Sequence, residues 1–180
     1  WRGGVWLTQT IESEGRVGLA SNLVLDEFDQ LHVGFLDATD NSNVLLKYGR
    51  WNGNDWQIET VDDEIKEFAS MKLDASGNPH FSYDAEDYDL KYAYWNGSGW
   101  STHLVDSFGR AGAYNSLALD EENHPHISYS DSLNQQLKYA HFDGSHWYTE
   151  TVDFDHGSSI GTSIAVDSAG NPYISYVGNG

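Results

Sequence analysis

Seven tryptophans occupy one short motif that recurs along the chain, and this motif holds the first candidates for binding chemistry. Each copy places two aromatic residues around a turn, and three of the four turns contain Asn-Gly or Asp-Gly. The copies are Trp51-Asn-Gly-Asn-Asp-Trp56, Trp95-Asn-Gly-Ser-Gly-Trp100, Phe142-Asp-Gly-Ser-His-Trp147 and the divergent Trp1-Arg-Gly-Gly-Val-Trp6. An aromatic face stacks on a sugar ring, while neighbouring Asn, Asp and Ser side chains supply directional hydrogen bonds. The motif therefore has the residue types of a carbohydrate-binding site.

The same aromatic residues also have a structural interpretation, because large rings at a fixed register wedge between packed sheets. We expect the second aromatic of each copy to belong to the core, and the first to face solvent, where a ligand can reach it. The expected core members are Trp56, Trp100 and Trp147, and the expected ligand contacts are Trp51, Trp95 and Phe142.

Three lysines recur at one position of the repeat, in a chain that has nine Lys and Arg residues in all. They are Lys47, Lys91 and Lys138. One interpretation is that each repeat offers a lysine to an acidic or hydroxylated ligand. The structural alternative is a cross-strand ion pair with a nearby acid, which contributes little to stability in water. The candidate acids are Glu59, Glu150, Asp37, Asp84 and Asp131.

Histidine also recurs in register, and two segments concentrate carboxylates. The histidines are His32, His80 and His126, with Tyr173 at the same place in the last repeat. In-register repetition is typical of a structural role, and the tyrosine breaks any fourfold set of metal ligands. The candidates for calcium, which takes six to eight oxygen ligands, are Asp153 and Asp155 in one loop and Asp84 and Asp87 in the other. Neither loop has the complete spacing of a calcium site, so acidic turns are the simpler interpretation and no cofactor is predicted.

No catalytic constellation is apparent in the sequence. A single active site needs groups that break the repeat, and the four arginines are scattered over loops and hairpins, at Arg2, Arg16, Arg50 and Arg110. Among 28 acidic residues, nothing selects a pair of carboxylates for glycoside hydrolysis. We therefore expect no enzymatic activity and no catalytic residue. The alternative is a fragment of a sialidase-like or other glycan-active enzyme.

Two sequence markers define the repeat that must position these residues. The second aromatic of the motif recurs in steps of 50, 44 and 47 residues, and a run that ends in Asp26, Asp74, Asp120 or Asp167 recurs in steps of 48, 46 and 47. The repeats, at about 7–56, 57–100, 101–147 and 148–180 plus 1–6, form one domain or domain fragment over 1–180.

Each repeat contains four short stretches of alternating apolar and polar residues, bounded by Gly, Asn, Asp and Pro, which predicts an all-β fold. Four strands in each repeat of this length predict a β-propeller of four-stranded antiparallel blades. Small residues alternate with large ones in the first stretch of a repeat, as at Ser116, Ala118, Ser163 and Ala165. Because blades crowd at the hub, we expect the first strands to be innermost.

The fourth repeat lacks one strand in this chain. Residues 7–11 are placed to complete its outer edge, but no residues remain for its third strand. Three explanations stay open: the chain is part of a longer propeller, another copy completes the ring, or the ring has one defective blade.

The repeat consensus is about Ser-Leu-Ala-Leu-Asp-x-x-Gly-Asn-Pro-His-Ile-Ser-Tyr, followed by Leu-Lys-Tyr-Ala-x-Trp-Asn-Gly-x-x-Trp. It resembles repeats of uncharacterised secreted and cell-surface β-propeller proteins of bacteria and archaea, over nearly the whole chain. The resemblance implies extracellular display and recognition. A more distant similarity to the Asp-box of sialidase-type propellers lacks that motif's residue order, so no sialidase residue is transferred.

Composition narrows the partners. The chain carries a formal net charge of -19, which repels nucleic acid and anionic lipid headgroups. No apolar run approaches the roughly 20 residues that span a bilayer, so membrane insertion is not expected. These features favour a non-enzymatic extracellular recognition or assembly module with a glycan or protein ligand. A lectin that uses the Trp hairpins is the specific alternative, and a homo-oligomer or a longer parent chain is the expected setting.

Overall fold

The computed structural model describes residues 4–40, 42–154 and 161–178, and this part of the chain is built from β-strands. The first sheet consists of β1 (Val17–Leu25), β2 (Leu31–Asp40), β3 (Asn43–Trp51) and β4 (Trp56–Asp62). The second consists of β5 (Ile65–Leu73), β6 (Pro79–Ala85), β7 (Leu90–Trp95) and β8 (Trp100–Asp106). The third consists of β9 (Ala111–Leu119), β10 (Pro125–Asp131), β11 (Gln136–Phe142) and β12 (Trp147–Asp153), and the fourth of β13 (Ser163–Val166) and β14 (Pro172–Ser175). The described residues include no helix that is long and apolar enough to cross a bilayer.

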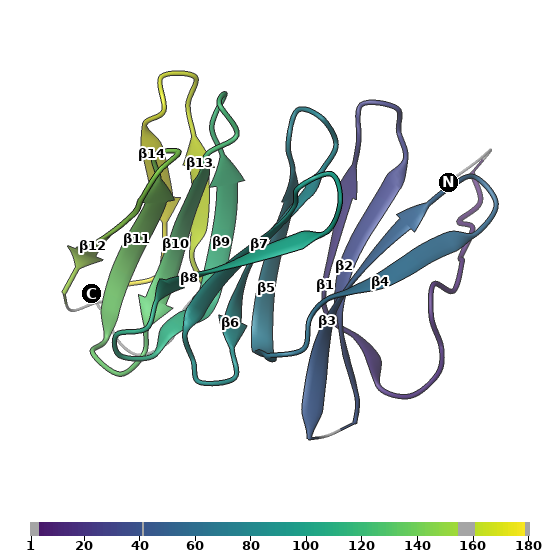
Figure 1. Cartoon of the computed structure of the whole chain (residues 1–180), viewed down its shortest axis with the longest axis horizontal. Helices are drawn as coiled ribbons and strands as arrows, with labels where there is room; N and C mark the ends of the chain where they lie inside the picture. Colours follow the sequence, from purple (N-terminus) through teal and green to yellow (C-terminus); the bar gives the residue numbers. More distant parts are fainter. Residues whose placement is uncertain (1–3, 41, 155–160, 179–180) are drawn as a thin grey trace.

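Every sheet is an antiparallel meander in which neighbours in sequence are neighbours in space. The four sheets stand side by side as blades of an open β-propeller (Figure 1). The predicted all-β propeller of four-stranded blades is therefore confirmed. The sheets end at Asp62, Asp106 and Asp153, several residues beyond the second tryptophan of each repeat, because that tryptophan begins the fourth strand instead of closing the blade.

Tight hairpins join the third and fourth strands, as the Asn-Gly and Asp-Gly motifs predict. Trp51 pairs with Trp56, Trp95 with Trp100 and Phe142 with Trp147, each directly across the hairpin. The glycine of each turn has a φ of +91° to +98°, a conformation that costs glycine little.

The first strands are innermost, as their small residues predict. β1 lies against β5, β5 against β9 and β9 against β13. The hub serines supply side-chain hydrogen bonds between blades: Ser70 Oγ accepts from the Leu117 backbone N–H at 3.1 Å, and Ser116 Oγ accepts from the Ile164 N–H at 3.3 Å. Hub packing thus combines close approach with hydrogen bonds that cross from one sheet to the next.

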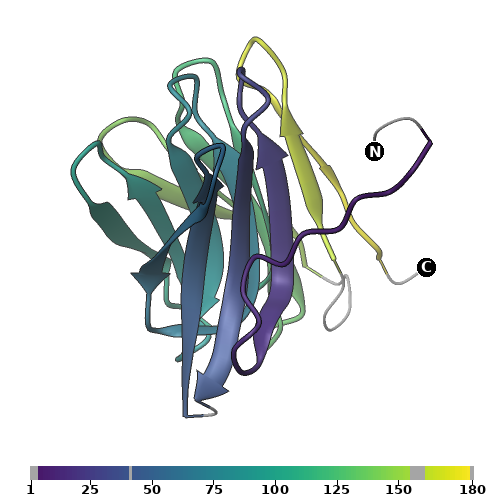
Figure 2. The same ribbon diagram turned by 90° about the vertical axis from the view of Figure 1, so that its right-hand side faces the viewer.

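The fourth sheet holds two strands among the described residues, and the segment before β1 does not join it. Residues 7–11 form no strand, and Figure 2 shows this segment as a coil outside the sheets. Glu12 instead contacts Lys47 of the first sheet. The expectation that residues 7–11 pair at the edge of the fourth blade is therefore not met within this chain.

Three hydrophobic cores lie between successive sheets of the described residues, and the smallest joins Ala118 and Tyr139 of the third sheet to Ile164 of the fourth. The other two are larger. One joins the first and second sheets and includes Tyr48 and Phe81; the other joins the second and third and includes Tyr92 and Ile127. The sheets approach so closely that a Cβ atom on Gly34 would lie 2.5 Å from the Phe81 ring. Neighbouring blades consequently share a hydrophobic core, and pockets lie between their outer halves.

Candidate functional site

A pocket of about 710 Å³ opens between the first and second sheets. Its first wall is formed by β3 and β4, where Tyr48 lies opposite Glu59 and Arg50 lies opposite Gln57. Directly paired residues of antiparallel strands share one face, and so do residues two apart in a strand. The four side chains therefore project together toward the second sheet, and all four line the pocket.

The second wall comes from the neighbouring blade. Trp95, at the end of β7, and the turn Gly77-Asn78-Pro79 before β6 line it. Trp100, the second tryptophan of this hairpin, packs between the sheets against Tyr48 and Phe81. The hairpin thus gives one indole to the core and one to the pocket.

A recurring hydrogen-bond chain positions Tyr48 at the base of the first wall. Its hydroxyl lies 2.6 Å from His32 Nδ1, and His32 Nε2 lies 3.5 Å from Asp26 Oδ2. Burial lowers the pKa of His32, and it raises the pKa of Tyr48 to about 12. A neutral imidazole with its proton on Nε2 then accepts from the Tyr48 hydroxyl and donates toward Asp26. The chain fixes the orientation of the Tyr48 ring.

Arg50 and Glu59 give the pocket opposite charges on one wall. Both side chains are open to solvent. The Arg50 guanidinium donates one bond to Gln30 Oε1, at 3.3 Å, and its remaining donors are available to a ligand. Partial burial raises the pKa of Glu59, and the nearby Trp100 indole N–H opposes this rise. A cationic donor and a carboxylate acceptor therefore face an indole across the pocket.

A second pocket, of about 270 Å³, lies between the second and third sheets. Tyr92, Tyr94 and His103 take the places of Tyr48, Arg50 and Glu59 in its first wall. On the other wall Phe142, with Trp147 beside it, takes the place of Trp95. The repeat thus builds the same kind of pocket twice with different side chains.

The sequence-predicted aromatics are distributed over three places. Trp95 lines the first pocket and Phe142 the second, whereas Trp51 packs against Trp56 in a tilted arrangement, with ring centroids 5.6 Å apart and planes at 56°. Trp51 lies on the opposite face of the first sheet from the pocket-lining Arg50, because side chains of successive residues in a strand alternate between faces. Trp100 and Trp147 pack against the two larger inter-sheet cores, so the expectation that they are core members is confirmed, whereas Trp56 belongs to none of the three cores.

The three repeated lysines line neither pocket. They form ion pairs at the boundaries of the sheets: Lys47 with Asp37 at 2.8 Å and Glu12 at 3.2 Å, Lys91 with Asp62 at 3.7 Å and with Glu64, and Lys138 with Asp106. Asp37 is the one partner among the acids that the sequence suggested. The others differ because Asp62 and Asp106 end the last strand of the preceding sheet, a neighbour that cross-strand reasoning within one repeat does not reveal.

Two of the four calcium candidates, Asp84 and Asp153, already accept hydrogen bonds from the protein. Asp84 Oδ1 accepts from the backbone N–H groups of Glu67 and Phe68 at 2.9 and 2.6 Å, and Asp153 accepts from the Tyr176 hydroxyl at 2.6 Å. Asp87 is exposed, and Asp155 lies outside the described residues. These carboxylates hold turns and neighbouring strands in place.

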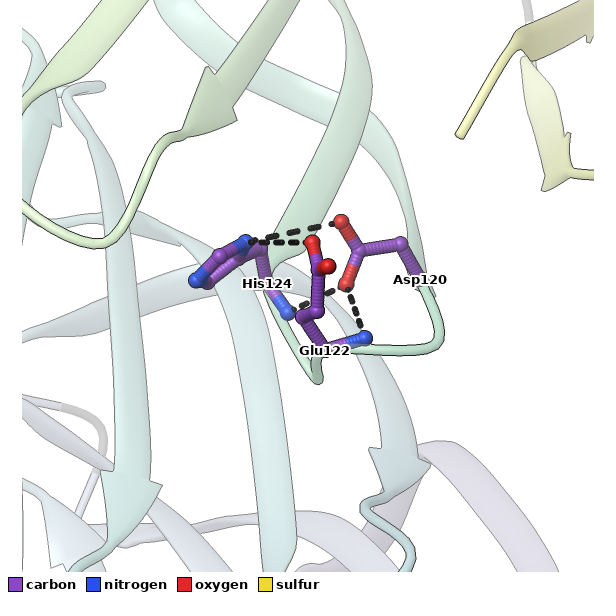
Figure 3. A group of neighbouring side chains, drawn as sticks. All are labelled: Asp120, Glu122 and His124. Atoms are coloured by element: carbon purple, nitrogen blue, oxygen red, sulfur yellow. Dashed lines mark hydrogen bonds and ion pairs between the residues drawn. The ribbon is translucent and has the colours of Figure 1, made fainter. Parts of the chain in front are cut away.

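One further cluster was missed from the sequence. Asp120, Glu122 and His124 bring one ligand atom each to within 4.8 Å of one another in the turn before β10 (Figure 3). Asp120 Oδ1 already accepts from the backbone N–H groups of Glu122 and His124. His124 replaces the Asn of the usual turn, as in Asn78 of the second repeat, which was the available signal. The group is a tight turn with three potential metal ligands.

Comparison with known proteins gives structural likenesses. No protein-family model matches the chain, and no curated protein matches it. A fucose lectin from Kordia zhangzhouensis in complex with methyl-fucoside superposes with a TM-score of 0.52 at 21% identity, covering 74% of this chain and 99% of the lectin. The SapL1 lectin in complex with alpha methyl fucoside gives 0.60 at 14% identity, covering 81% of this chain and 52% of that one.

A third neighbour is AofleA from Arthrobotrys oligospora, in a variant with three arginines replaced by alanine. It gives a TM-score of 0.62 at 12% identity and covers 89% of this chain and 51% of that chain. The chain therefore spans nearly all of the Kordia lectin and about half of the other two. At these identities the likeness establishes the fold, a repeated-blade architecture that lectins also use.

Proposed function

We propose that this protein is a carbohydrate-binding module that holds a terminal sugar in the pocket between its first two sheets. The observation that carries the proposal is the placement of Arg50 and Glu59 on one wall, opposite the indole of Trp95 on the other. No bond of the ligand is broken: the pocket supplies recognition, and the function is non-enzymatic.

A pyranose fits this chemistry because it has hydroxyls at its edge and an apolar C–H face. The Arg50 guanidinium donates to sugar oxygens in a planar fork, and the Glu59 carboxylate accepts from hydroxyl protons. Trp95 offers the apolar surface on which the ring face packs. Hydrogen bonds to charged groups contribute about 1.5–3 kcal/mol each, which is enough for specificity in an open pocket.

The structural neighbours support this class of ligand. Two of them are described as lectins bound to a methyl fucoside, one of which is as short as three quarters of the present chain. Methyl α-fucoside is therefore the first probe, within a panel of neutral methyl glycosides.

Titration calorimetry with the panel tests the proposal. Arg50→Ala, Glu59→Gln and Trp95→Ala should each weaken binding at least tenfold, which corresponds to about 1.4 kcal/mol. The matched controls are Arg110→Ala, whose guanidinium lies over the Tyr88 ring, and Trp51→Ala, which lies away from the pocket. Both controls should retain binding.

The proposal fails if no glycoside binds the wild-type protein, or if binding survives in both Arg50→Ala and Trp95→Ala. Thermal unfolding of every variant separates a loss of binding from a loss of the fold. Trp95 and Arg50 lie at the rim of the pocket and not in the inter-sheet core, so these variants should stay folded.

A further inference from the structure

The second pocket has its own chemistry, because the charged pair of the first pocket is replaced. Tyr94 stands where Arg50 stands, and His103 stands where Glu59 stands. Both replacements are aromatic, and no Arg, Lys, Asp or Glu side chain lines the second pocket. The second pocket therefore has no pair of oppositely charged side chains that could hydrogen-bond the hydroxyls of a ligand, as the first pocket has.

Its first wall is a continuous aromatic surface. The rings of His80 and Tyr94 stack at 5.8 Å with planes 26° apart, and those of Tyr94 and His103 stack at the same distance and angle. Tyr92 stacks on Tyr94 at 5.7 Å and 25°. The result is a flat surface that crosses β6, β7 and β8.

The facing wall is also aromatic. Phe142 lies 6.4 Å from the His124 ring in an edge-on arrangement and 5.4 Å from the Trp147 ring. A small apolar group that enters between the walls contacts rings on both sides, where dispersion and apolar burial favour it.

Neutral hydrogen-bonding groups in this pocket lack partners. Among the described residues, the Tyr94 hydroxyl and the His103 imidazole are half-buried and make no hydrogen bond within the protein. The Trp147 indole N–H is buried without a partner. His80 is 5% exposed, and its Nε2 atom lies 3.5 Å from Asp74 Oδ2, so it is not a free group. Unsatisfied buried donors cost free energy, which a ligand acceptor can restore.

We infer that the second pocket binds a neutral acetamido sugar, an N-acetylhexosamine, which makes it a site of different specificity from the first. An acetamido group carries a methyl, an acceptor and a donor in one plane. Its methyl fits between Phe142 and the Tyr94 ring, its carbonyl accepts from the Tyr94 hydroxyl, and its N–H donates to a nitrogen of His103.

The first pocket disfavours the same group. A methyl placed against Arg50 and Glu59 would remove water from two charges without replacing their hydrogen bonds. The inference extends the proposed function, since it treats both inter-sheet pockets as sugar sites of one repeat. A single chain would then bind two different sugars of one glycan.

The test titrates the wild-type protein with the methyl glycosides of N-acetylglucosamine, N-acetylgalactosamine and fucose. Phe142→Ala and His103→Ala should weaken binding of an acetamido sugar at least tenfold, and Arg50→Ala should leave it unchanged. Conversely, Arg50→Ala should remove fucoside binding and Phe142→Ala should spare it. The double variant Tyr94→Arg/His103→Glu should lose the acetamido sugar.

Saturation-transfer NMR gives a second measurement that does not depend on variants. Irradiating the aromatic protons should transfer most strongly to the acetyl methyl, and excess fucoside should not displace the acetamido sugar. The inference is overturned if neither acetamido glycoside binds, or if Arg50→Ala abolishes its binding while Phe142→Ala does not. In either case, fucoside binding that depends on Arg50 would keep the proposed function of the first pocket. If an acetamido sugar binds through Phe142 and no ligand depends on Arg50, the proposed function of the first pocket is wrong and the inference about the second pocket stands.

Discussion

Trp100 of the second sheet packs edge-on against Tyr48 of the first, with ring centroids 5.6 Å apart and planes at 73°. Trp147 and Tyr92 repeat this relationship one blade further on, at 5.3 Å and 67°. Each contact joins two blades and includes a tyrosine that lines an inter-sheet pocket. Edge-to-face aromatic pairs contribute about 0.5–1.5 kcal/mol beyond the area that they bury. Trp147 therefore both stabilises the fold and lines a pocket, whereas Trp100 stabilises the fold and packs against Tyr48, which lines one.

Replacing Trp100 by Ala should lower the free energy of unfolding by about 3–5 kcal/mol, because a large ring leaves a cavity between two sheets. Chemical denaturation followed by circular dichroism measures this change. Trp95→Ala, in the same hairpin, should cost clearly less, since its ring lines the pocket. Equal losses for the two variants would contradict the assignment of Trp100 to the core and Trp95 to the site.

The repeat predicts the blades well because strand alternation, Asn-Gly turns and small hub residues are local signals. Ser116 illustrates this, as its place in a first strand predicts the hub position at which it accepts a bond from Ile164. The site was harder to predict because it joins two blades. Arg50 seemed to be one of four scattered arginines, and its relation to Trp95 exists only once the neighbouring sheets pack.

The aspartate partners of Lys91 and Lys138 were also hard to predict from the sequence, because they lie in a different sheet. Lys138 and Asp106 are 32 residues apart and belong to different sheets. No pattern within one repeat connects them, so the sequence suggested Glu150 or Asp131 instead. Only the register of consecutive blades places the last residue of one sheet beside the third strand of the next.

The pair of Lys138 and Asp106 should be important for holding the second and third sheets together. Both side chains are less than a tenth exposed, and Asp106 Oδ2 also accepts from the Tyr129 hydroxyl at 2.7 Å. Lys138→Met leaves a buried carboxylate without its counter-charge, which should cost about 3–5 kcal/mol in urea unfolding. Lys72→Met is the control, because Lys72 is exposed on β5 and should change stability by less than about 0.5 kcal/mol.

A small effect of Lys138→Met, comparable to that of Lys72→Met, would show that the pair is hydrated and contributes little. The salt dependence of this stability difference is an independent test of whether the pair is buried. Screening weakens exposed pairs much more than buried ones, so the difference between the wild type and Lys138→Met should persist at high ionic strength.

The buried histidines should make the protein sensitive to mild acid. Burial lowers the pKa of His32, His80 and His126 below the ordinary value of 6.5. The unfolded chain then takes up protons before the folded chain does as the pH falls. Stability from these groups is present above about pH 6.5 and is lost as the pH falls through the folded values. Thermal unfolding between pH 7.5 and 5 should show a falling Tm.

Substituting His126 by Asn should remove one part of this acid sensitivity. The variant is expected to be less stable than the wild type at pH 7.5, because it loses the bond to the Tyr139 hydroxyl, at 2.5 Å. The difference should shrink toward pH 5, where the wild type bears the cost of protonating a buried imidazole. A difference that stays constant with pH would contradict a buried neutral histidine at this position.

Asp84 should show the opposite pH dependence. Its side chain is 2% exposed, and burial raises its pKa to about 6 although two backbone N–H groups donate to it. A raised pKa means that the folded protein binds the proton more tightly than the unfolded chain. The stability that the protonated group contributes is complete below about pH 3.8 and is lost as the pH rises through 6.

Asp84→Asn should therefore gain stability relative to the wild type between pH 4 and 7, by on the order of 3 kcal/mol for a shift of this size. Asp131, the last residue of β10 in the third sheet, is the control, because hydrogen bonds from Asn134 and from backbone N–H groups lower its pKa despite its burial. Asp131→Asn should become more destabilising over the same pH range, since the wild-type carboxylate is stabilised once it is ionised. Urea unfolding of both variants at pH 4, 5.5 and 7 should show stability differences that change with pH in opposite directions. Changes in the same direction would contradict the opposite pKa shifts of the two carboxyl groups.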